Sequence, residues 1–225
     1  MDAVAGDLVA LGVLSEPQRA RIYAHIAGTK EPCSRQEVSE TLGIGRTLVA
    51  FHLDKLQRAG LVRTVAGRAA SGGRGRPPQR FAVTRRDLSA SVPPRRYELL
   101  AELLVQAVAE HTADEPLRKA ALRVARRRGS ELAHDAAAGK HPSTARDLLA
   151  DLLERLGYQP RHNGNQVVLT NCPFERLRIH DSELVCSINL ALATGYLEGL
   201  GLADDFAARL APCPVNCCVV LEPAA

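Results

Sequence analysis

The chain has no tryptophan, a single methionine and only 4% aromatic residues among its 225 residues. Hydrophobic residues still make up 46%, so a core must consist mainly of Leu, Val and Ala. The sequence also lacks any run of about 18 apolar residues, which argues against a membrane-spanning helix. Its first residues, MDAVAGDLVALG, have no basic start and do not resemble a secretion signal. We therefore expect a cytoplasmic protein of one large or two modest domains.

Signatures of catalysis are missing as well. The sequence contains no nucleophile elbow, no G-x-G-x-x-G after a predicted strand and no C-x-x-C redox pair. The stretch CPVNC is one residue too wide for such a pair. We therefore expect that the protein is not an enzyme.

Charge is distributed unevenly along the chain. Residues 1–90 carry 14 Lys and Arg against 8 Asp and Glu, whereas residues 91–225 carry 15 against 17. A basic first part joined to a nearly neutral second part indicates an anionic partner for the first part, such as nucleic acid.

The first third of the chain predicts three helices. SEPQRARIYAHIAG begins with Ser15 as the expected N-cap and with Pro17 in the first turn. In SRQEVSETLG, Ser34 and Glu37 have the spacing of a capping box, and Gly43 ends the helix.

The third predicted helix is IGRTLVAFHLDKLQRAG, with Val49, Leu53 and Leu56 at helical spacing. The short turn LGIG joins it to the helix before it, which is the pattern of a helix-turn-helix. LVRTV and RFAVT then predict two strands around the Gly- and Arg-rich loop AGRAASGGRGRPPQ. A helix-turn-helix followed by such a hairpin is a winged helix.

Candidate DNA-binding residues follow from this arrangement. The N-terminal part of a recognition helix meets base edges, and arginines on a basic loop suit phosphates or a minor groove. The candidates are Arg46, Thr47, Ala50, Phe51, Lys55, Arg68, Arg74, Arg76 and Arg80. His52 lies beside the buried stripe and is interpreted as a packed or phosphate-contacting residue rather than a metal ligand.

RTLVAFHLDKLQRAGLV followed by GRGRPPQRF resembles the winged-helix DNA-binding domain of ArsR-type bacterial transcriptional regulators. The resemblance covers roughly residues 12–87 and implies binding to a double-stranded DNA operator. The Cys-x-Cys metal motif of the founding ArsR repressors is absent, since Cys33 stands alone before Ser34. Metal sensing by that motif is therefore not implied.

ASVPP, residues 90–94, predicts a domain junction. Three helices are expected after it, in RRYELLAELLVQAVAEH, DEPLRKAALRVARRRGSELAHDAAAG and TARDLLADLLERLGY. RVARRRG is interpreted as a solvated helix face, with a second nucleic-acid patch as the alternative. Because DNA half-sites require two readers, we expect a homodimer that pairs through these helices.

The end of the chain predicts a small α/β domain that holds five of the six cysteines. QVVLTN and CCVVLE are the expected strands, and ELVCSINLALATGYLEGLGL is the expected helix between them. The cysteine spacing is C-x13-C-x26-C-x3-C-C, which lacks the close pairs of a zinc ribbon or finger. The cysteines are either ordinary core residues or ligands from separate elements that converge on an iron–sulfur cluster or a zinc ion.

NCPF, LVCSINLAL, GLGL and CCVVLE together resemble the C-terminal sensor domain of SufR-like regulators, which holds an iron–sulfur cluster. The resemblance implies Cys172 and Cys186 as the first pair of ligands. Nothing matches a third cysteine near residue 200. Cys213, Cys217 or Cys218 could supply the last ligand, and His180 could complete the set.

The predicted fold is α+β, with three parts. These are a winged helix-turn-helix at residues 1–90, a helical dimerisation segment at 91–142 and a cysteine-bearing α/β sensor domain at 143–225. The predicted function is a transcriptional regulator whose operator affinity depends on an iron–sulfur cluster, or on metal or redox state, at Cys172, Cys186, Cys217 and Cys218. Zinc is the second cofactor candidate. The alternative function is a winged-helix regulator whose C-terminal pocket binds a small apolar effector, with structural cysteines.

Overall fold

The structure is a computed structural model that describes residues 3–65, 79–84, 87–138, 144–211 and 216–224. The chain divides into two compact units, residues 1–90 and residues 91–225. Each unit has its own hydrophobic core and its own small sheet, so the fold is α+β. None of the helices in the described ranges is long and apolar enough to cross a membrane.

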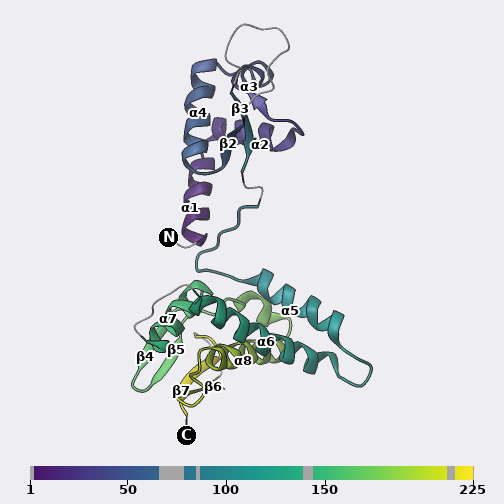
Figure 1. Cartoon of the computed structure of the whole chain (residues 1–225), viewed down its shortest axis with the longest axis vertical. Helices are drawn as coiled ribbons and strands as arrows, with labels where there is room; N and C mark the ends of the chain where they lie inside the picture. The colour runs from purple at the N-terminus through teal and green to yellow at the C-terminus, as the bar shows by residue number, and fades with distance from the viewer. Residues whose placement is uncertain (1–2, 66–78, 85–86, 139–143, 212–215, 225) are drawn as a thin grey trace. The chain divides into compact units, whose positions relative to one another are not determined.

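In the described residues, the first unit contains four helices and a three-stranded antiparallel sheet of order β1-β3-β2 (Figure 1). Its helices are α1 (Ala3–Leu14), α2 (Pro17–Gly28), α3 (Arg35–Leu42) and α4 (Arg46–Arg58). Its strands are β1 (Cys33–Ser34), β2 (Val62–Val65) and β3 (Arg80–Val83). The expected helix-turn-helix and both hairpin strands are present. Helix α1 was not expected, because its sequence is apolar on every side and therefore shows no helical periodicity.

The helix ends of this unit agree with the sequence in two cases out of three. The capping box is present, with the Ser34 side chain bound to the Glu37 amide and the Glu37 carboxylate bound to the Ser34 amide. Gly43 ends α3 with a φ of 66°, which is a conformation that glycine favours. Ser15 was wrong as the N-cap of α2. Pro17 occupies the first helical position, so the cap is Glu16, whose carboxylate accepts the amides of the second and third helical residues.

Over its described residues, the second unit contains four α-helices, a short 3-10 helix and a four-stranded antiparallel sheet of order β4-β5-β7-β6. Its helices are α5 (Tyr97–Glu110), α6 (Leu117–Ala137), α7 (Ala145–Arg155), η1 (Glu175–Ile179) and α8 (Ser182–Gly199). Its strands are β4 (Pro160–Asn163), β5 (Gln166–Leu169), β6 (Phe206–Leu210) and β7 (Val219–Pro223). Strand β6 and helix η1 were not expected from the sequence.

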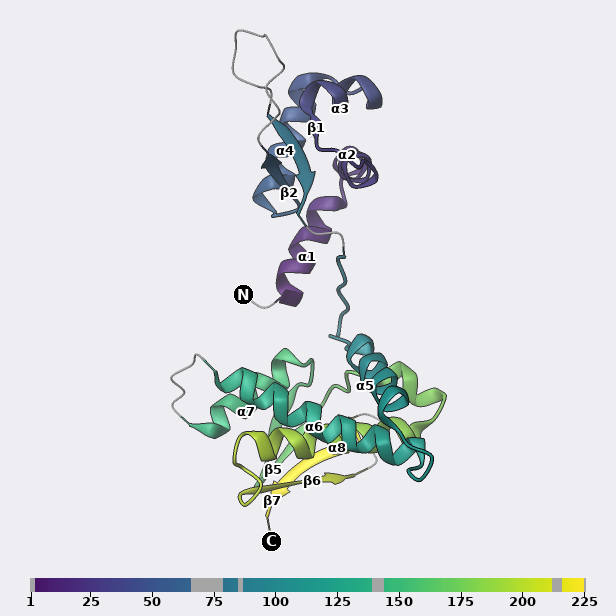
Figure 2. The same ribbon diagram turned by 45° about the vertical axis from the view of Figure 1, so that its right-hand side comes forward.

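Helix α8 is the central element of this unit, because it packs against α6 on one side and against β6 and β7 on the other (Figure 2). The contact with α6 is close because both helices present glycine there. A Cβ atom on Gly195 would lie 2.0 Å from the carbonyl oxygen of Arg126. One on Gly129 would lie 2.2 Å from the carbonyl oxygen of Leu192. Only glycine allows the two backbones to approach in this way.

Residues 91–142, predicted as a helical dimerisation segment, lie in the same compact unit as residues 143–225. Helices α5 and α6 share one hydrophobic core with α8 and the sheet, and all of them belong to the unit that begins at Ser91. The periodicity of these helices could not reveal this, since an amphipathic helix buries its apolar face equally well against a partner subunit or against its own chain.

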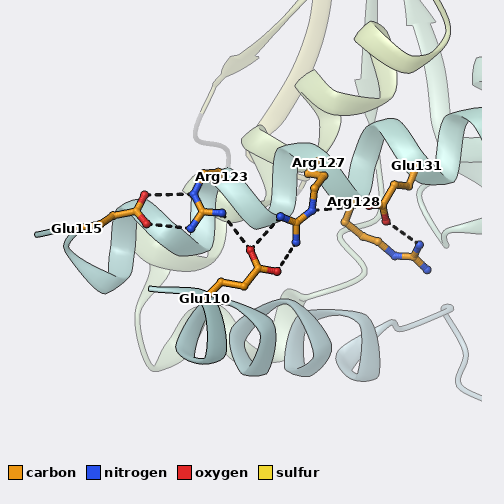
Figure 3. A network of polar contacts seen from close by, with 6 residues as sticks. All are labelled: Glu110, Glu115, Arg123, Arg127, Arg128 and Glu131. Carbon is orange, nitrogen blue, oxygen red and sulfur yellow. Dashed lines mark hydrogen bonds and ion pairs between the residues drawn. The ribbon is translucent and has the colours of Figure 1, made fainter. Parts of the chain in front are cut away.

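The arginines of RVARRRG lie on α6 and are bound to carboxylates. Arg123 and Arg127 both bind Glu110 at the end of α5, and Arg123 also binds Glu115 at 2.9 Å (Figure 3). Arg126 and Arg128 pair with Glu198 and Glu131, respectively. All four guanidinium groups therefore have carboxylate partners, which agrees with a solvated helix face rather than a second nucleic-acid patch.

Candidate functional site

Helix α4 presents a polar surface because its opposite face is fully buried. Val49, Leu53 and Leu56 have no exposed surface, and they fix the rotation of the helix about its axis. Arg46, Thr47 and Phe51 are consequently exposed, and Ala50 is half-buried. The predicted recognition surface is therefore accessible along the first two turns of the helix.

Four of the predicted DNA-binding residues line one shallow hollow of about 780 Å³. Arg46, Thr47 and Ala50 form its side on α4, and Arg80 contributes from the start of β3. The N-terminal turn of α3 closes the hollow. Three arginines, Arg35, Arg46 and Arg80, line this concave surface together with Glu37 and Glu40, and arginines at such a surface can contact a phosphate backbone.

Arg80 also has a structural role that the sequence did not indicate. Its Nη2 binds both carboxylate oxygens of Glu37, at 3.1 and 3.0 Å, and its Nε donates to the Pro32 carbonyl oxygen at 2.7 Å. The residue thus fastens the strand at the base of the predicted wing to the capping box of α3.

Phe51 and Lys55 act as a pair on the exposed side of α4. The Lys55 ammonium lies 5.6 Å from the centre of the Phe51 ring, which is a cation–π distance. His52 lies on the inner side, 5% exposed, with its Nδ1 3.4 Å from a carboxylate oxygen of Glu16. This position agrees with a packed histidine.

The three remaining predicted DNA-binding residues, Arg68, Arg74 and Arg76, lie outside the described residues. The strands that flank them are paired, with Val65 opposite Arg80 and Val62 opposite Val83. The hairpin that carries the predicted wing is therefore formed.

Residues 14–65 match a family of helix-turn-helix domains. The matched range includes α2, α3, α4 and β2, and it ends where the predicted wing begins. Helix-turn-helix domains of this kind occur in DNA-binding transcriptional regulators, so the match supports a winged-helix regulator. The chain matches no curated protein.

The second candidate site lies in the core of the second unit. Cys172 follows β5, Cys186 lies on α8, and Cys217 and Cys218 directly precede β7. None of the four is more than 9% exposed. The antiparallel pairing of β5 with β7 explains this convergence, because it brings the end of one strand beside the start of the other. In addition, the Cys217 amide donates to the Leu169 carbonyl oxygen at 2.8 Å.

The four thiols form a row in which Cys172 interacts with Cys217, Cys217 with Cys218, and Cys218 with Cys186. The bond from Cys217 lowers the pKa of Cys172. Bonds from Cys217 and Cys186, with the charge of Arg178, lower the pKa of Cys218 to about 6. Burial, followed by the bond to Cys218, raises the pKa of Cys186 to about 12. Cys172 and Cys218 are thus the two thiols of the row whose pKa is lowered.

Two residues outside the row interact with these sulfurs. Asn189, which is fully buried on α8, donates from its amide to the Cys217 sulfur at 3.1 Å. The Tyr158 hydroxyl donates to the other end of the same amide and so fixes its orientation. Arg178 is near enough for its charge to act on Cys186 and Cys218, and its buried Nε has no hydrogen-bond partner among the described residues.

The donor set has the chemistry of a thiolate-ligated metal centre, since soft sulfur ligands select iron–sulfur clusters and zinc. Among the described residues, no group of three or more His, Cys, Asp or Glu side chains is arranged so that it could hold a metal ion. The sulfurs interact with one another, so a bound centre would have to replace these interactions. His180 is exposed after η1, unlike the buried cysteines, and Cys213 lies outside the described residues.

A cleft of about 800 Å³ lies elsewhere in this unit, between α7 and the sheet. Its apolar lining includes Leu149, Leu153 and Phe206, and its polar lining includes Arg146 and His162. None of the four clustered cysteines is among its lining residues. A pocket of this size could hold a small organic molecule.

Sequence reasoning did not identify Asn189 or Asn171 as parts of the site. For Asn189 a signal was present, because a single amide interrupts the apolar helical run LVCSINLAL. A polar side chain at a buried helical position requires a hydrogen-bond partner. Asn171 precedes Cys172 directly, but its contacts come from residues 94 and 95, which no local pattern connects to it.

Proposed function

We propose that this protein is a transcriptional regulator whose affinity for its DNA operator is controlled by the state of Cys172, Cys186, Cys217 and Cys218. The controlling state is an iron–sulfur cluster or the oxidation state of the thiols, with zinc as a further cofactor candidate. The protein acts by binding rather than by catalysis. The observation that carries the proposal is the gathering of these four buried thiols in a chain that also has a helix-turn-helix match.

The DNA-binding part of the proposal is supported by the accessible face of α4. Arg46 and Thr47 lie at the N-terminal end of the helix, where base contacts are made, and Lys55 follows on a later turn, where it can contact phosphate. Much of the affinity is expected from Arg and Lys contacts to phosphate, so binding falls steeply as salt concentration rises.

The sensing part is supported by the chemistry around the four sulfurs. Cys172, Cys186, Cys217 and Cys218 are the residues that would hold a cluster, which when bound supplies one-electron redox chemistry. The Asn189 amide donates to sulfur, and the charge of Arg178 offsets the negative charge that thiolates bring into a core. A difference of about 1–3 kcal/mol between two cysteine states would change operator affinity about 5–150-fold.

A homodimer is part of the proposal, because an operator with two half-sites requires two recognition helices. Helix α5 offers a surface for pairing. Its Leu103 is buried, whereas Val105 and Val108 are 68% and 56% exposed. Together with Leu104, which is 37% exposed, they form an apolar stripe with no partner in the described part of the chain.

A second candidate function is regulation by a small apolar effector that binds in the cleft between α7 and the sheet. The observation in its favour is the apolar lining by Leu149, Leu153 and Phe206. In this case the cysteines are structural, and their replacement leaves the regulated DNA binding unchanged.

The experiment begins with anaerobic purification, followed by a visible absorption spectrum and by iron, sulfide and zinc analysis. A DNA duplex is selected from a random pool with the wild-type protein, and its affinity is measured before and after treatment with hydrogen peroxide. We expect the affinity to change at least fivefold, and Cys172→Ser and Cys186→Ser to abolish the change. Cys33→Ser is the matched control, since Cys33 is also buried but belongs to the first unit.

Iron and sulfide near stoichiometry identify a cluster, and zinc alone identifies a zinc site. Protein that holds neither metal and binds DNA equally well before and after peroxide would overturn the sensing proposal and favour the effector cleft.

A further inference from the structure

Residues 94–96, at the start of the second unit, are bonded to the loop that carries Cys172. The Asn171 amide donates to the Pro94 carbonyl oxygen at 3.1 Å. The Arg95 guanidinium returns two bonds from its Nη1, to the Asn171 side-chain oxygen at 2.6 Å and to the Cys172 carbonyl oxygen at 2.7 Å. The Arg96 amide donates to the Pro173 carbonyl oxygen at 3.1 Å. Residues 94–96 are therefore joined to residues 171–173 by hydrogen bonds that involve every residue of both segments.

The same residues also bind the end of α7. The Asn171 amide donates to the Gly157 carbonyl oxygen as well, and the Arg96 guanidinium donates to the Arg155 carbonyl oxygen. Gly157 has a φ of 91°, and a Cβ atom there would lie 3.1 Å from the Cβ atom of Pro94. Asn171 is only 6% exposed, so these bonds are shielded from water.

This junction is placed where the second unit receives the chain from the first. The first unit ends at Ala90, and the Ser89 amide is bound to the Asp7 carboxylate on α1 at 3.4 Å. Ser91 begins the second unit, and its hydroxyl accepts the Arg95 amide at 2.8 Å. Only Ala90 separates these two anchored residues, so residues 91–96 are the covalent route by which the second unit is joined to the first.

We propose that Asn171 and Arg95 couple the state of Cys172 to the DNA-binding unit through residues 91–96. The inference rests on the proposed function and specifies its route. Any change at the Cys172 sulfur that moves residues 171–173 must also move Pro94, Arg95 and Arg96, because their carbonyl oxygens and amides are bound together. Asn171 and Arg95 are positioning residues here, since neither supplies a sulfur.

The test compares operator affinity before and after peroxide for wild type, Arg95→Met and Arg123→Met. Arg95→Met keeps an unbranched apolar stem and removes both guanidinium bonds. Arg123→Met is the matched control, because it removes an arginine with ion pairs to Glu110 and Glu115 in the same unit but outside the junction. Metal content and the number of reactive thiols are measured for each protein.

We expect the wild type and Arg123→Met to change affinity at least fivefold and Arg95→Met to change less than twofold, with equal metal and thiol content. If the operator affinity of Arg95→Met changes on peroxide treatment as much as that of the wild type, the inference is overturned and the proposed function stands. A wild type with no change contradicts the proposed function itself, and the inference with it.

A second measurement needs no variant. Hydrogen exchange of the wild type is followed by mass spectrometry in both cysteine states, on a peptide that includes the Arg95 and Arg96 amides. We expect exchange at these amides to differ at least threefold between the states, whereas β6 exchanges equally in both. Equal exchange at residues 95 and 96 overturns the coupling, even where Arg95→Met fails to fold.

Discussion

The amide nitrogen of Asn189 lies 3.1 Å from the sulfur of Cys217, inside a core that water does not reach. The two residues come from α8 and from the segment before β7, 28 positions apart in the chain. The bond makes the cysteine site more than a set of packed thiols, because it supplies an oriented donor to a sulfur that also interacts with the thiols of Cys172 and Cys218.

Replacing Asn189 by Leu should destabilise the second unit. The substitution leaves the Tyr158 hydroxyl buried without its acceptor and removes the donor to Cys217, and an unsatisfied buried group costs about 1–3 kcal/mol. Urea unfolding measures the loss. Gln166→Leu removes a partly buried hydrogen bond from the Gln166 side-chain amide to Glu222, and it should lower the free energy of unfolding by less than half as much. Equal losses for both variants would contradict the assignment.

Replacing Gly195 by Ala should separate α6 from α8. The added Cβ atom would lie 2.0 Å from a backbone oxygen, which cannot rotate away, so the helices must shift at a cost of about 1–3 kcal/mol or more. Thermal unfolding measures the effect. Gly12→Ala is the control, because nothing lies within 4 Å of its added carbon and a helical Ala is favoured by about 0.5–1 kcal/mol.

Replacing Arg46 by Ala should weaken DNA binding by about 1–3 kcal/mol and relax base preference at one position of the operator. The reason is the exposed place of Arg46 at the first turn of α4, on the edge of the hollow. Fluorescence anisotropy with the selected duplex and its single-base variants measures both effects. Arg21→Ala on α2, which removes bonds to Gln18 and Leu42, should bind as wild type does.

Acid should remove the contribution of the Glu110 carboxylate to the free energy of unfolding. Hydrogen bonds from Arg127 and Arg123 lower the pKa of Glu110 from 4.5 to about 2. A carboxyl group with a lowered pKa in the folded state stabilises the fold above its unfolded pKa, and this stabilisation is lost as the pH falls toward 2. The difference in unfolding free energy between wild type and Glu110→Gln should therefore shrink between pH 4.5 and pH 2. A constant difference would show that these ion pairs contribute nothing.

Replacing Val105 by Glu should dissociate the proposed dimer. Val105 is 68% exposed in the single chain, and a carboxylate in an apolar interface would be buried without a partner. Sedimentation velocity measures the oligomeric state. Gln106→Glu adds the same charge at the neighbouring exposed position, outside the apolar stripe, and should leave the mass unchanged. A wild type that sediments as a monomer would remove the basis for this prediction.

Local sequence determined the helix-turn-helix and the hairpin strands of the first unit, though not helix α1. The capping box at Ser34 and Glu37, the glycine at position 43 and the spacing of Val49, Leu53 and Leu56 depend on residues within one or two turns. Such short-range preferences appear in the sequence because the interacting groups are neighbours along the chain. The same reasoning correctly located the strands of the hairpin and the long helix that carries Cys186.

Only the tertiary structure decided how the second unit is assembled. The sequence could place cysteines near the ends of elements, but the row of thiols depends on the pairing of β5 with β7 and on the rotation of α8. The packing of α6 into the core of the second unit depends on glycines at its contact with α8. The bonds of Arg95 to Asn171 and Cys172 join residues 76 and 77 positions apart. Contacts of this range depend on the packing of the whole core, which no local pattern of residues encodes.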